Sequence, residues 1–280
     1  MAIRPGAALA RKETSAPKMP HLDALQPLYD MNVHPRRGEL IMIVGRSGSF
    51  KSTVALFLAE SWGLPTLYFS ADMSMSQATL KLSALRTQTS TAEVEASIAS
   101  GDAERFIEAL HESKVEFNFR SPIMFADITL ELNAWVTLHN AYPEVIVIDN
   151  LQDIEGGESD YTEQMFNMSA LSDLARQTGS TIVLLHHATE SGQFSAGDYV
   201  RPPSRNSIKN KVTEKPELIL GVAANGDLGD LYLAPLKNRL GYADPTGHTF
   251  ARLKVDPERN LIHTGRSEDY LPPLAIANGA

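Results

Sequence analysis

The residues that most constrain the fold are 39–63, where an apolar run meets a glycine-containing loop and then a helical pattern. ELIMIVG (39–45) has the composition of a buried strand, and GRSGSFKST (45–53) follows it directly. TVALFLAESWG (53–63) then carries apolar residues at helical spacing and ends on a glycine. A strand, a glycine-containing turn and a helix in this order predict an α/β fold with a phosphate-binding loop after the strand.

The loop departs at one position from the phosphate-binding pattern G-x-x-x-x-G-K-[ST]. Gly45 opens the pattern and Lys51 and Ser52 close it, but Phe50 stands where the second glycine is usual. We expect Lys51 to meet the β- and γ-phosphates of a nucleotide and Ser52 to reach Mg²⁺, with Gly48 adding backbone freedom. The Phe50 ring should then turn away from the phosphates into the apolar layer under the helix. The predicted nucleotide-binding residues are Gly45, Arg46, Ser47, Gly48, Ser49, Phe50, Lys51, Ser52 and Thr53; the alternative is a chance glycine- and lysine-containing turn.

The rest of the chain continues the alternation of strands and helices, which predicts a parallel, doubly wound sheet with helices on both faces. Further strands are expected at 65–70, 115–119, 144–150 and 180–187. Helices are expected at 76–88, 91–113, 130–141 and before residue 178. Short strands at 217–223, 230–236, 248–255 and 260–264 indicate an antiparallel C-terminal extension of the sheet.

Three segments outside this alternation lack a packed-core pattern. We expect 1–37 to be a flexible arm or linker containing a possible docking helix, HLDALQPLYDM (21–31), and 267–280 to be a flexible tail. The segment 188–211 is rich in Gly, Ser and Pro and is expected to be a long mobile loop. One domain, 38–266, remains between the two ends.

Composition excludes several classes of function. The chain has no cysteine, so disulfides, thiolate metal sites and cysteine nucleophiles are excluded. It has no long apolar run, and we expect a soluble cytoplasmic protein of a bacterial cell, possibly phage-encoded. The formal net charge of −9 means that any contact with nucleic acid has to come from a local basic patch.

Three polar residues end the predicted strands near the loop. Asp149 closes the strand VIVID and suits a carboxylate that holds Mg²⁺ through water, although such an aspartate also caps turns. Asp72 follows the next strand and suits a general base for the attacking water, with helix capping as the alternative. His187 ends LLHH (184–187) and suits a contact to the γ-phosphate, whereas His186 should face the other side of the strand and be structural.

Two cations lie further along the chain in LKNRLG (236–241). Lys237 and Arg239 are two residues apart, so they share one face if the segment is a strand. Such a pair can stabilise developing charge on a phosphate. An ordinary solvated surface pair is the alternative.

These pieces, in this order, resemble the ring-shaped replicative helicases of the DnaB-like type within the RecA-like ATPases, including small phage-encoded and plasmid RepA-type relatives. The motifs that carry the resemblance are G-x4-(G)-K-S, F-S-x-D-M, V-I-D-N-L-Q, L-L-H-H and K-N-R-x-G. The resemblance implies a RecA-like P-loop NTPase core that hydrolyses ATP with Mg²⁺, held by Ser52 and Asp149. It implies His187 as γ-phosphate sensor, and Lys237 and Arg239 acting in trans on the nucleotide of a neighbouring subunit.

The resemblance also implies a ring, expected to be a hexamer, around single-stranded DNA, with a possible loader or other replication partner. The loop that lines the channel in the family matches 201–211 here, and its cations are Arg201, Arg205, Lys209 and Lys211. Residues 201–215 contain five basic residues against one acid, which suits phosphate contact. Two features depart from the family: Asp72 replaces a usual Glu, and Phe50 replaces glycine. The helix in 21–31 would pack on an adjacent subunit, as the linker does in the family.

Two other functions are compatible with these motifs. One is a RecA-like recombinase or strand-annealing ATPase that forms filaments. The other is an ATP-binding regulatory or loader module with weak hydrolysis, which Phe50 and Asp72 favour. The leading interpretation is an ATP-dependent ring helicase.

Overall fold

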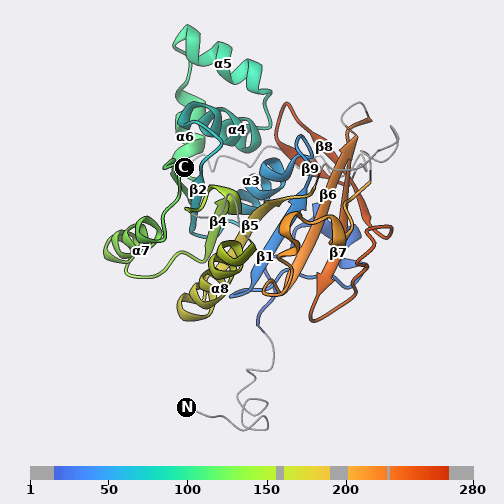
Figure 1. The fold of residues 1–280 in the computed structure, drawn as a ribbon. Helices are drawn as coiled ribbons and strands as arrows, with labels where there is room; N and C mark the ends of the chain where they lie inside the picture. Colours follow the sequence, from blue (N-terminus) through green and yellow to red (C-terminus); the bar gives the residue numbers. More distant parts are fainter. Residues whose placement is uncertain (1–15, 156–160, 190–200, 226–227, 265–280) are drawn as a thin grey trace.

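The computed structural model describes residues 16–155, 161–189, 201–225 and 228–264, which form one α/β unit around a nine-stranded sheet (Figure 1). The strand order is β3-β2-β4-β5-β1-β6-β7-β8-β9. The strands are β1 (Leu40–Gly45), β2 (Thr66–Ser70), β3 (Val115–Asn118), β4 (Val145–Asp149), β5 (Thr181–His187), β6 (Leu218–Asn225), β7 (Asp230–Asn238), β8 (Ala251–Asp256) and β9 (Leu261–His263).

The six strands from β3 to β6 are parallel, and the antiparallel extension begins only with β7. All five pairs among β3, β2, β4, β5, β1 and β6 are parallel, while β6–β7, β7–β8 and β8–β9 are antiparallel. The expectation that residues 217–223 open the antiparallel extension is therefore wrong in this detail, because β6 lies parallel to β1. The mostly parallel sheet with an antiparallel C-terminal part is confirmed.

Helices cover both faces of the sheet, as a parallel sheet with buried strands requires. The α-helices are α2 (Gln26–Tyr29), α3 (Lys51–Ser61), α4 (Met75–Thr87), α5 (Thr91–Ser100), α6 (Glu104–His111), α7 (Phe125–His139) and α8 (Tyr161–Thr178). Short 3₁₀ turns complete the described elements: η1 (Asp23–Leu25), η2 (Leu151–Asp153), η4 (Arg205–Ser207) and η5 (Lys209–Lys211).

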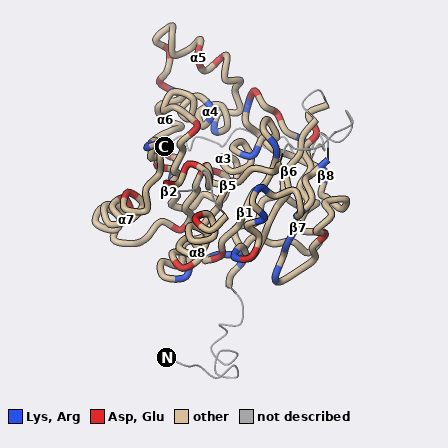
Figure 2. The backbone as a smooth tube through the Cα atoms, viewed as in Figure 1, with Lys and Arg blue, Asp and Glu red and all other residues tan. Residues whose placement is uncertain are grey.

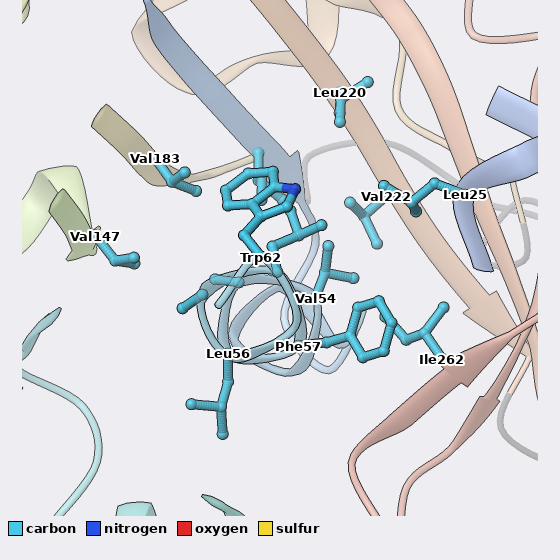
Figure 3. Close-up of a cluster of buried hydrophobic side chains, with 14 of the residues drawn as sticks. Leu25, Val54, Leu56, Phe57, Trp62, Val147, Val183, Leu220, Val222 and Ile262 are labelled. Carbon is cyan, nitrogen blue, oxygen red and sulfur yellow. The ribbon is translucent and has the colours of Figure 1, made fainter. Parts of the chain in front are cut away.

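One face of the sheet packs on α3 and α4. Val54 and Phe57 of α3 are buried in this layer together with Ile262 of β9, and Figure 3 shows the Phe57 ring beside Ile262. The opposite face packs on α7 and α8, through side chains such as Trp135 and Leu171. We call these two layers the α3 face and the α8 face.

The segment 16–37 packs on the same chain, which differs from the flexible linker that we expected. Leu25 and Leu28, in the short helical turns η1 and α2, are buried in the α3-face core, and Met19 and Val33 are buried with them. These turns contact β8 and β9 of their own sheet. The apolar side chains of HLDALQPLYDM are therefore occupied within one chain, so they are not available to dock on a neighbour.

Other predicted flexible segments lie outside the described residues: 1–15, most of the acidic stretch 155–160, 190–200 within the predicted long loop, and the tail 267–280. Among the helices of the described ranges, none has the length and apolar character needed to cross a membrane.

Candidate nucleotide-binding site

The predicted phosphate loop connects β1 to α3 and places the helix N-terminus at the carboxyl end of β1. Helix α3 begins at Lys51, and Phe50 is its N-cap residue in the left-handed conformation, with φ 64° and ψ 25°. Glycine is favoured in that conformation because it lacks a β-carbon, which explains the usual glycine at this position. As predicted, the Phe50 side chain packs against the apolar core of the α3 face. Phe50 therefore keeps the backbone geometry of the loop while its ring lies in the core.

The start of the loop is closed around Gly45. A β-carbon on Gly45 would stand 2.2 Å from Ser49 Oγ and 2.8 Å from the Val222 carbonyl oxygen. Ser49 is buried, and among the described residues its hydroxyl has no hydrogen-bond partner. An orphaned hydroxyl inside a loop of this geometry fits a site that is completed by an oxygen-rich ligand.

Lys51 is held at the mouth of the loop. Its side chain is buried, and Nζ donates to the Arg46 carbonyl oxygen at 2.9 Å. A buried ammonium group bonded to a backbone carbonyl beside a helix N-terminus has the position and charge to meet a phosphate.

Asp149 ends β4 and points toward the start of α3. The residue is 2% exposed, and its carboxylate accepts hydrogen bonds from the Ser52 hydroxyl and, at 3.1 Å, from the Tyr68 hydroxyl. Burial raises the pKa of Asp149, while the bonds from Ser52 and Tyr68 oppose that rise. The structure thus brings together the two residues predicted to serve Mg²⁺.

Asp72 lies next to Asp149, after the end of the neighbouring strand β2. Ser70 of β2 is in register with Asp149, and the Ala71 N–H donates to the Asp149 carbonyl oxygen at 3.1 Å. The Asp72 carboxylate accepts a hydrogen bond from Asn150 Nδ2 at 3.2 Å. Asp72 also contributes repulsion to the raised pKa of Asp149, so the two carboxylates sit in one electrostatic environment.

The two histidines that end β5 face opposite sides, as predicted. His187 is in register with Gly45 and lies two residues after Leu185, which belongs to the α3 face. His186 is fully buried, and its Nε2 lies 2.9 Å from the Lys209 carbonyl oxygen. Burial lowers the pKa of His186 to about 4, so the imidazole is neutral near pH 7 and Nε2 is the donor.

The donor set fits a magnesium nucleotide better than a protein-only metal site. Within the described ranges, no group of three or more His, Asp or Glu side chains is arranged to hold a metal ion. Mg²⁺ on nucleotides is usually held by one hydroxyl or carboxylate, by waters and by the phosphates. Ser52 and Asp149 supply that set and leave the other positions to phosphate and water.

Lys237 and Arg239 share one side of β7, as predicted, but lie toward the other end of β1. Both donate to the Glu214 carbonyl oxygen, at 2.7 Å from Lys237 Nζ and 3.2 Å from Arg239. Lys237 pairs with Ile219, which pairs with Met42, three residues before the loop opens at Gly45. The pair therefore does not join Lys51 and Asp149 within one chain.

The basic segment 201–211 is ordered against the carboxyl end of β5. Thr189 donates twice to the Ser207 carbonyl oxygen, at 2.7 Å and 3.0 Å, and the guanidinium of Arg205 donates to Thr213 Oγ1. Together with the turn at 245–248, this segment lines a cavity of about 600 Å³. The lining residues are Ser204, Arg205, Asn206, Lys211, Thr213, Pro245, Thr246 and His248.

The four predicted DNA-contacting cations differ in their surroundings. Arg201 and Lys211 are exposed, whereas Arg205 and Lys209 are half-buried. The Arg201 carbonyl oxygen accepts a hydrogen bond from Arg46 of the phosphate loop at 3.3 Å. The segment thus touches the loop at one end and the cavity at the other.

Two residues near the site were missed in the sequence, Tyr68 and Asn150. A tyrosine inside the apolar strand TLYFS is a signal, because a buried hydroxyl needs a partner. Asn150 directly follows Asp149, but only the register of β2 on β4 shows that its amide meets Asp72.

Solved structures with this fold are ATPase domains of DnaB-like helicases. One of them, an ATPase domain determined on its own, superposes with a TM-score of 0.72 at 13% identity, covering 93% of this chain and 97% of that one. A DnaB-like replicative helicase, described with its interactions with primase, superposes with a TM-score of 0.73 at 13% identity, covering 92% of this chain and 66% of that one. The RecA-like fold expected from the motifs is confirmed.

Two phage proteins are related in sequence. The Gene 65 protein of Mycobacterium phage L5 is 30% identical over 244 residues, 83% of this chain and 90% of its own length. The Gene 65 protein of Mycobacterium phage D29 is 30% identical over 227 residues, 77% of this chain and 94% of its own. A family described as AAA domain matches residues 20–193, which include the loop, both carboxylates and His187. The chain belongs to the AAA domain family and has the fold of a DnaB-like helicase ATPase domain.

Proposed function

We propose that this protein is an ATP-dependent DNA helicase that assembles as a hexameric ring and translocates on single-stranded DNA in replication. The observation that carries the proposal is the meeting of Lys51, Ser52 and Asp149 at the carboxyl ends of β1 and β4. Ligands of open α/β sheets bind at that edge. The fold shared with DnaB-like helicase ATPase domains supports the same conclusion.

In this proposal each residue near the loop has a separate task. Lys51 and the N–H groups at the start of α3 bind the phosphates of ATP, and Ser52 and Asp149 hold the Mg²⁺ that neutralises them. Asp72 orients the attacking water as general base, and His187 contacts the γ-phosphate. The Phe50 ring takes no part in binding because it lies in the core.

Lys237 and Arg239 are proposed to act in trans. Their place toward the amino end of β1 separates them from the loop of their own chain. In a ring, the nucleotide of a neighbouring subunit is the phosphate that they would reach. Hydrolysis would then require assembly.

The segment 201–211 is proposed to hold the DNA backbone. Lys and Arg are spread among Asp and Glu over the described chain in Figure 2, so a local site has to supply the contact. The cavity between 201–213 and 245–248 offers Arg205, Lys211 and His248 beside hydroxyl groups, which suits a phosphodiester. Replacement of the exposed Lys211 by Gln should weaken binding of single-stranded DNA uniformly across sequences and reduce its salt dependence.

A forked-duplex unwinding assay with Mg-ATP tests the proposal. Wild-type protein should separate the strands, Lys51→Ala should not, and Lys114→Ala, which removes an exposed lysine just before β3, should behave as wild type. Unwinding that survives Lys51→Ala, or no unwinding by an assembled wild-type ring, would overturn the proposal. Closed rings in electron micrographs would distinguish it from a filament-forming recombinase.

A further inference from the structure

Strands β2 and β4 exchange hydrogen bonds through two side chains beside the site carboxylates. Tyr68 of β2 donates to Asp149 of β4 at 3.1 Å, and Asn150, directly after β4, donates to Asp72, just beyond β2, at 3.2 Å. Each strand and the residues that follow it thus carry one carboxylate and the donor that holds the carboxylate of the other strand.

Both donors are fixed by their surroundings. Tyr68 is fully buried, and it lies diagonally across from Asp149 because Ser70 is the residue in register with that aspartate. Asn150 is 4% exposed, its Oδ1 accepts the Gln152 N–H at 2.9 Å, and its own N–H donates to Asp153 at 3.0 Å. With Oδ1 engaged in this way, Nδ2 is the atom left to face Asp72.

We propose that Tyr68 and Asn150 are positioning residues that hold the two carboxylates for Mg²⁺ and for the attacking water; this rests on the proposed function. The Tyr68 hydroxyl binds one oxygen of Asp149, Oδ2, and so sets the direction of the other toward the metal-side waters. The Asn150 amide keeps Asp72, which is shorter than the glutamate usual in related helicases, close to Asp149.

The two halves of this brace predict two different defects. Loss of the Tyr68 hydroxyl frees the Asp149 carboxylate, so the Mg²⁺ dependence of nucleotide binding should change. Loss of the Asn150 amide frees Asp72, which serves the water, so turnover should fall while nucleotide binding is retained. A purely structural role would lower the stability of either variant and leave both of these readouts unmoved.

The chain offers matched controls for both changes. Tyr232→Phe removes a hydroxyl that donates to the buried Asp230 at 3.2 Å, far along the sheet on β7. Asn118→Ser changes an asparagine whose Nδ2 donates to Glu131 at 2.9 Å and whose Oδ1 accepts the Arg120 N–H at 2.9 Å, which is the pattern of Asn150. Serine at position 150 keeps a hydroxyl that can cap the Gln152 N–H, so Asn150→Ser removes mainly the bond to Asp72.

The test measures binding of a fluorescent N-methylanthraniloyl ADP to the full chain over a titration of MgCl₂, together with steady-state ATP hydrolysis. Tyr68→Phe should need about 10-fold more Mg²⁺ than Tyr232→Phe for half-maximal tightening, and the two should bind equally in EDTA. Asn150→Ser should show the Mg²⁺ dependence of Asn118→Ser with about 10-fold lower kcat and an unchanged KM. Asp72→Glu added to Asn150→Ser should restore part of kcat, because the longer side chain reaches the water without the amide.

The outcomes separate this inference from the proposed function. Failure of wild-type protein to bind the nucleotide at any Mg²⁺ concentration would overturn both. Binding by wild type, with Tyr68→Phe equal to Tyr232→Phe and Asn150→Ser equal to Asn118→Ser, would overturn the brace alone. If Tyr68→Phe fails to fold, the Asn150→Ser comparison and its rescue by Asp72→Glu decide the matter.

Discussion

The Ser49 hydroxyl occupies the space that a β-carbon of Gly45 would need, 2.2 Å from the ideal position of that atom. The Val222 carbonyl oxygen lies 2.8 Å from the same point, so backbone closes the other side. The first residue of the loop is therefore restricted to glycine by space, since no positive φ is required there.

Gly45→Ala should consequently displace the loop. We expect a loss of about 2 kcal/mol in the free energy of unfolding and a loss of nucleotide binding, because Ser49 or the Val222 carbonyl must move. Urea denaturation and fluorescent-nucleotide binding measure the two effects. Gly63→Ala is the control: it has φ +62° in open space, and should cost about 1 kcal/mol with binding unchanged. Equal effects of the two changes on binding would contradict this account of the loop.

Phe50 gives a prediction about the order of two variants. Both Phe50→Ala and Phe50→Gly lose the packing of the ring on the core, but only glycine relieves the left-handed backbone at φ 64°. Phe50→Gly should therefore be more stable than Phe50→Ala by about 1 kcal/mol, although alanine is the better helix former. Equilibrium unfolding in urea measures the difference. ATP affinity should stay within a few-fold of wild type in both, and a large gain in Phe50→Gly would show that Phe50 disables the loop.

Lys237 predicts a pH effect on turnover. Burial, with the nearby guanidinium groups of Arg239 and Arg205, lowers the pKa of Lys237 to about 8. If Lys237 serves a neighbouring nucleotide as a cation, DNA-stimulated hydrolysis should fall as pH rises through about 8, and Lys237→Arg should remove that fall. A rate profile on both sides of that pKa tests this, with the same fall in both proteins as the contradicting result.

The same group should affect stability in the opposite direction. Its folded-state pKa lies below the unfolded value of 10.5, so the unfolded chain binds more protons between the two values. The contribution of Lys237 to the free energy of unfolding therefore rises with pH over this range. A fall in rate above the folded-state pKa that followed a loss of stability would not be due to Lys237.

His186 predicts acid sensitivity of the contact between β5 and the segment 201–211. Burial lowers its pKa to about 4 from 6.5, so the unfolded chain binds the extra proton first as pH falls. The stabilisation, at most about 3 kcal/mol, is present above pH 6.5 and is lost as pH falls from 6.5 toward 4. Urea unfolding of wild type and His186→Gln at about pH 7.5 and about pH 5 should show the difference between them narrowing at the lower pH. A constant difference would contradict this assignment.

The parallel strands could be predicted from the sequence because they are buried on both faces and therefore read as short apolar runs. ELIMIVG and EVIVIDN are examples, and the observed strands Leu40–Gly45 and Val145–Asp149 lie within them. Helix α7 was predicted to begin at residue 130 but begins at Phe125, because Met124 before it provides no side-chain cap that would signal the start. The parallel pairing of β6 on β1 could not be read, since a short strand near turns is also typical of a hairpin.

The site residues divide in the same way. Lys51, Ser52 and Asp149 follow from a motif and a strand end, and the structure brings them together. Tyr68 and Asn150 depend on which strands are neighbours and in which register, and a single sequence does not contain that information. The expected docking role of residues 21–31 failed because an amphipathic pattern shows that a face is buried without showing on what.

The most direct test of the central claim is the rate of ATP hydrolysis with and without saturating single-stranded DNA. The account predicts that DNA raises the wild-type rate, that Lys51→Ala lowers both rates by about 100-fold or more, and that Lys114→Ala leaves them unchanged. A wild-type rate that DNA does not raise, or Lys51→Ala turnover equal to wild type, would contradict it.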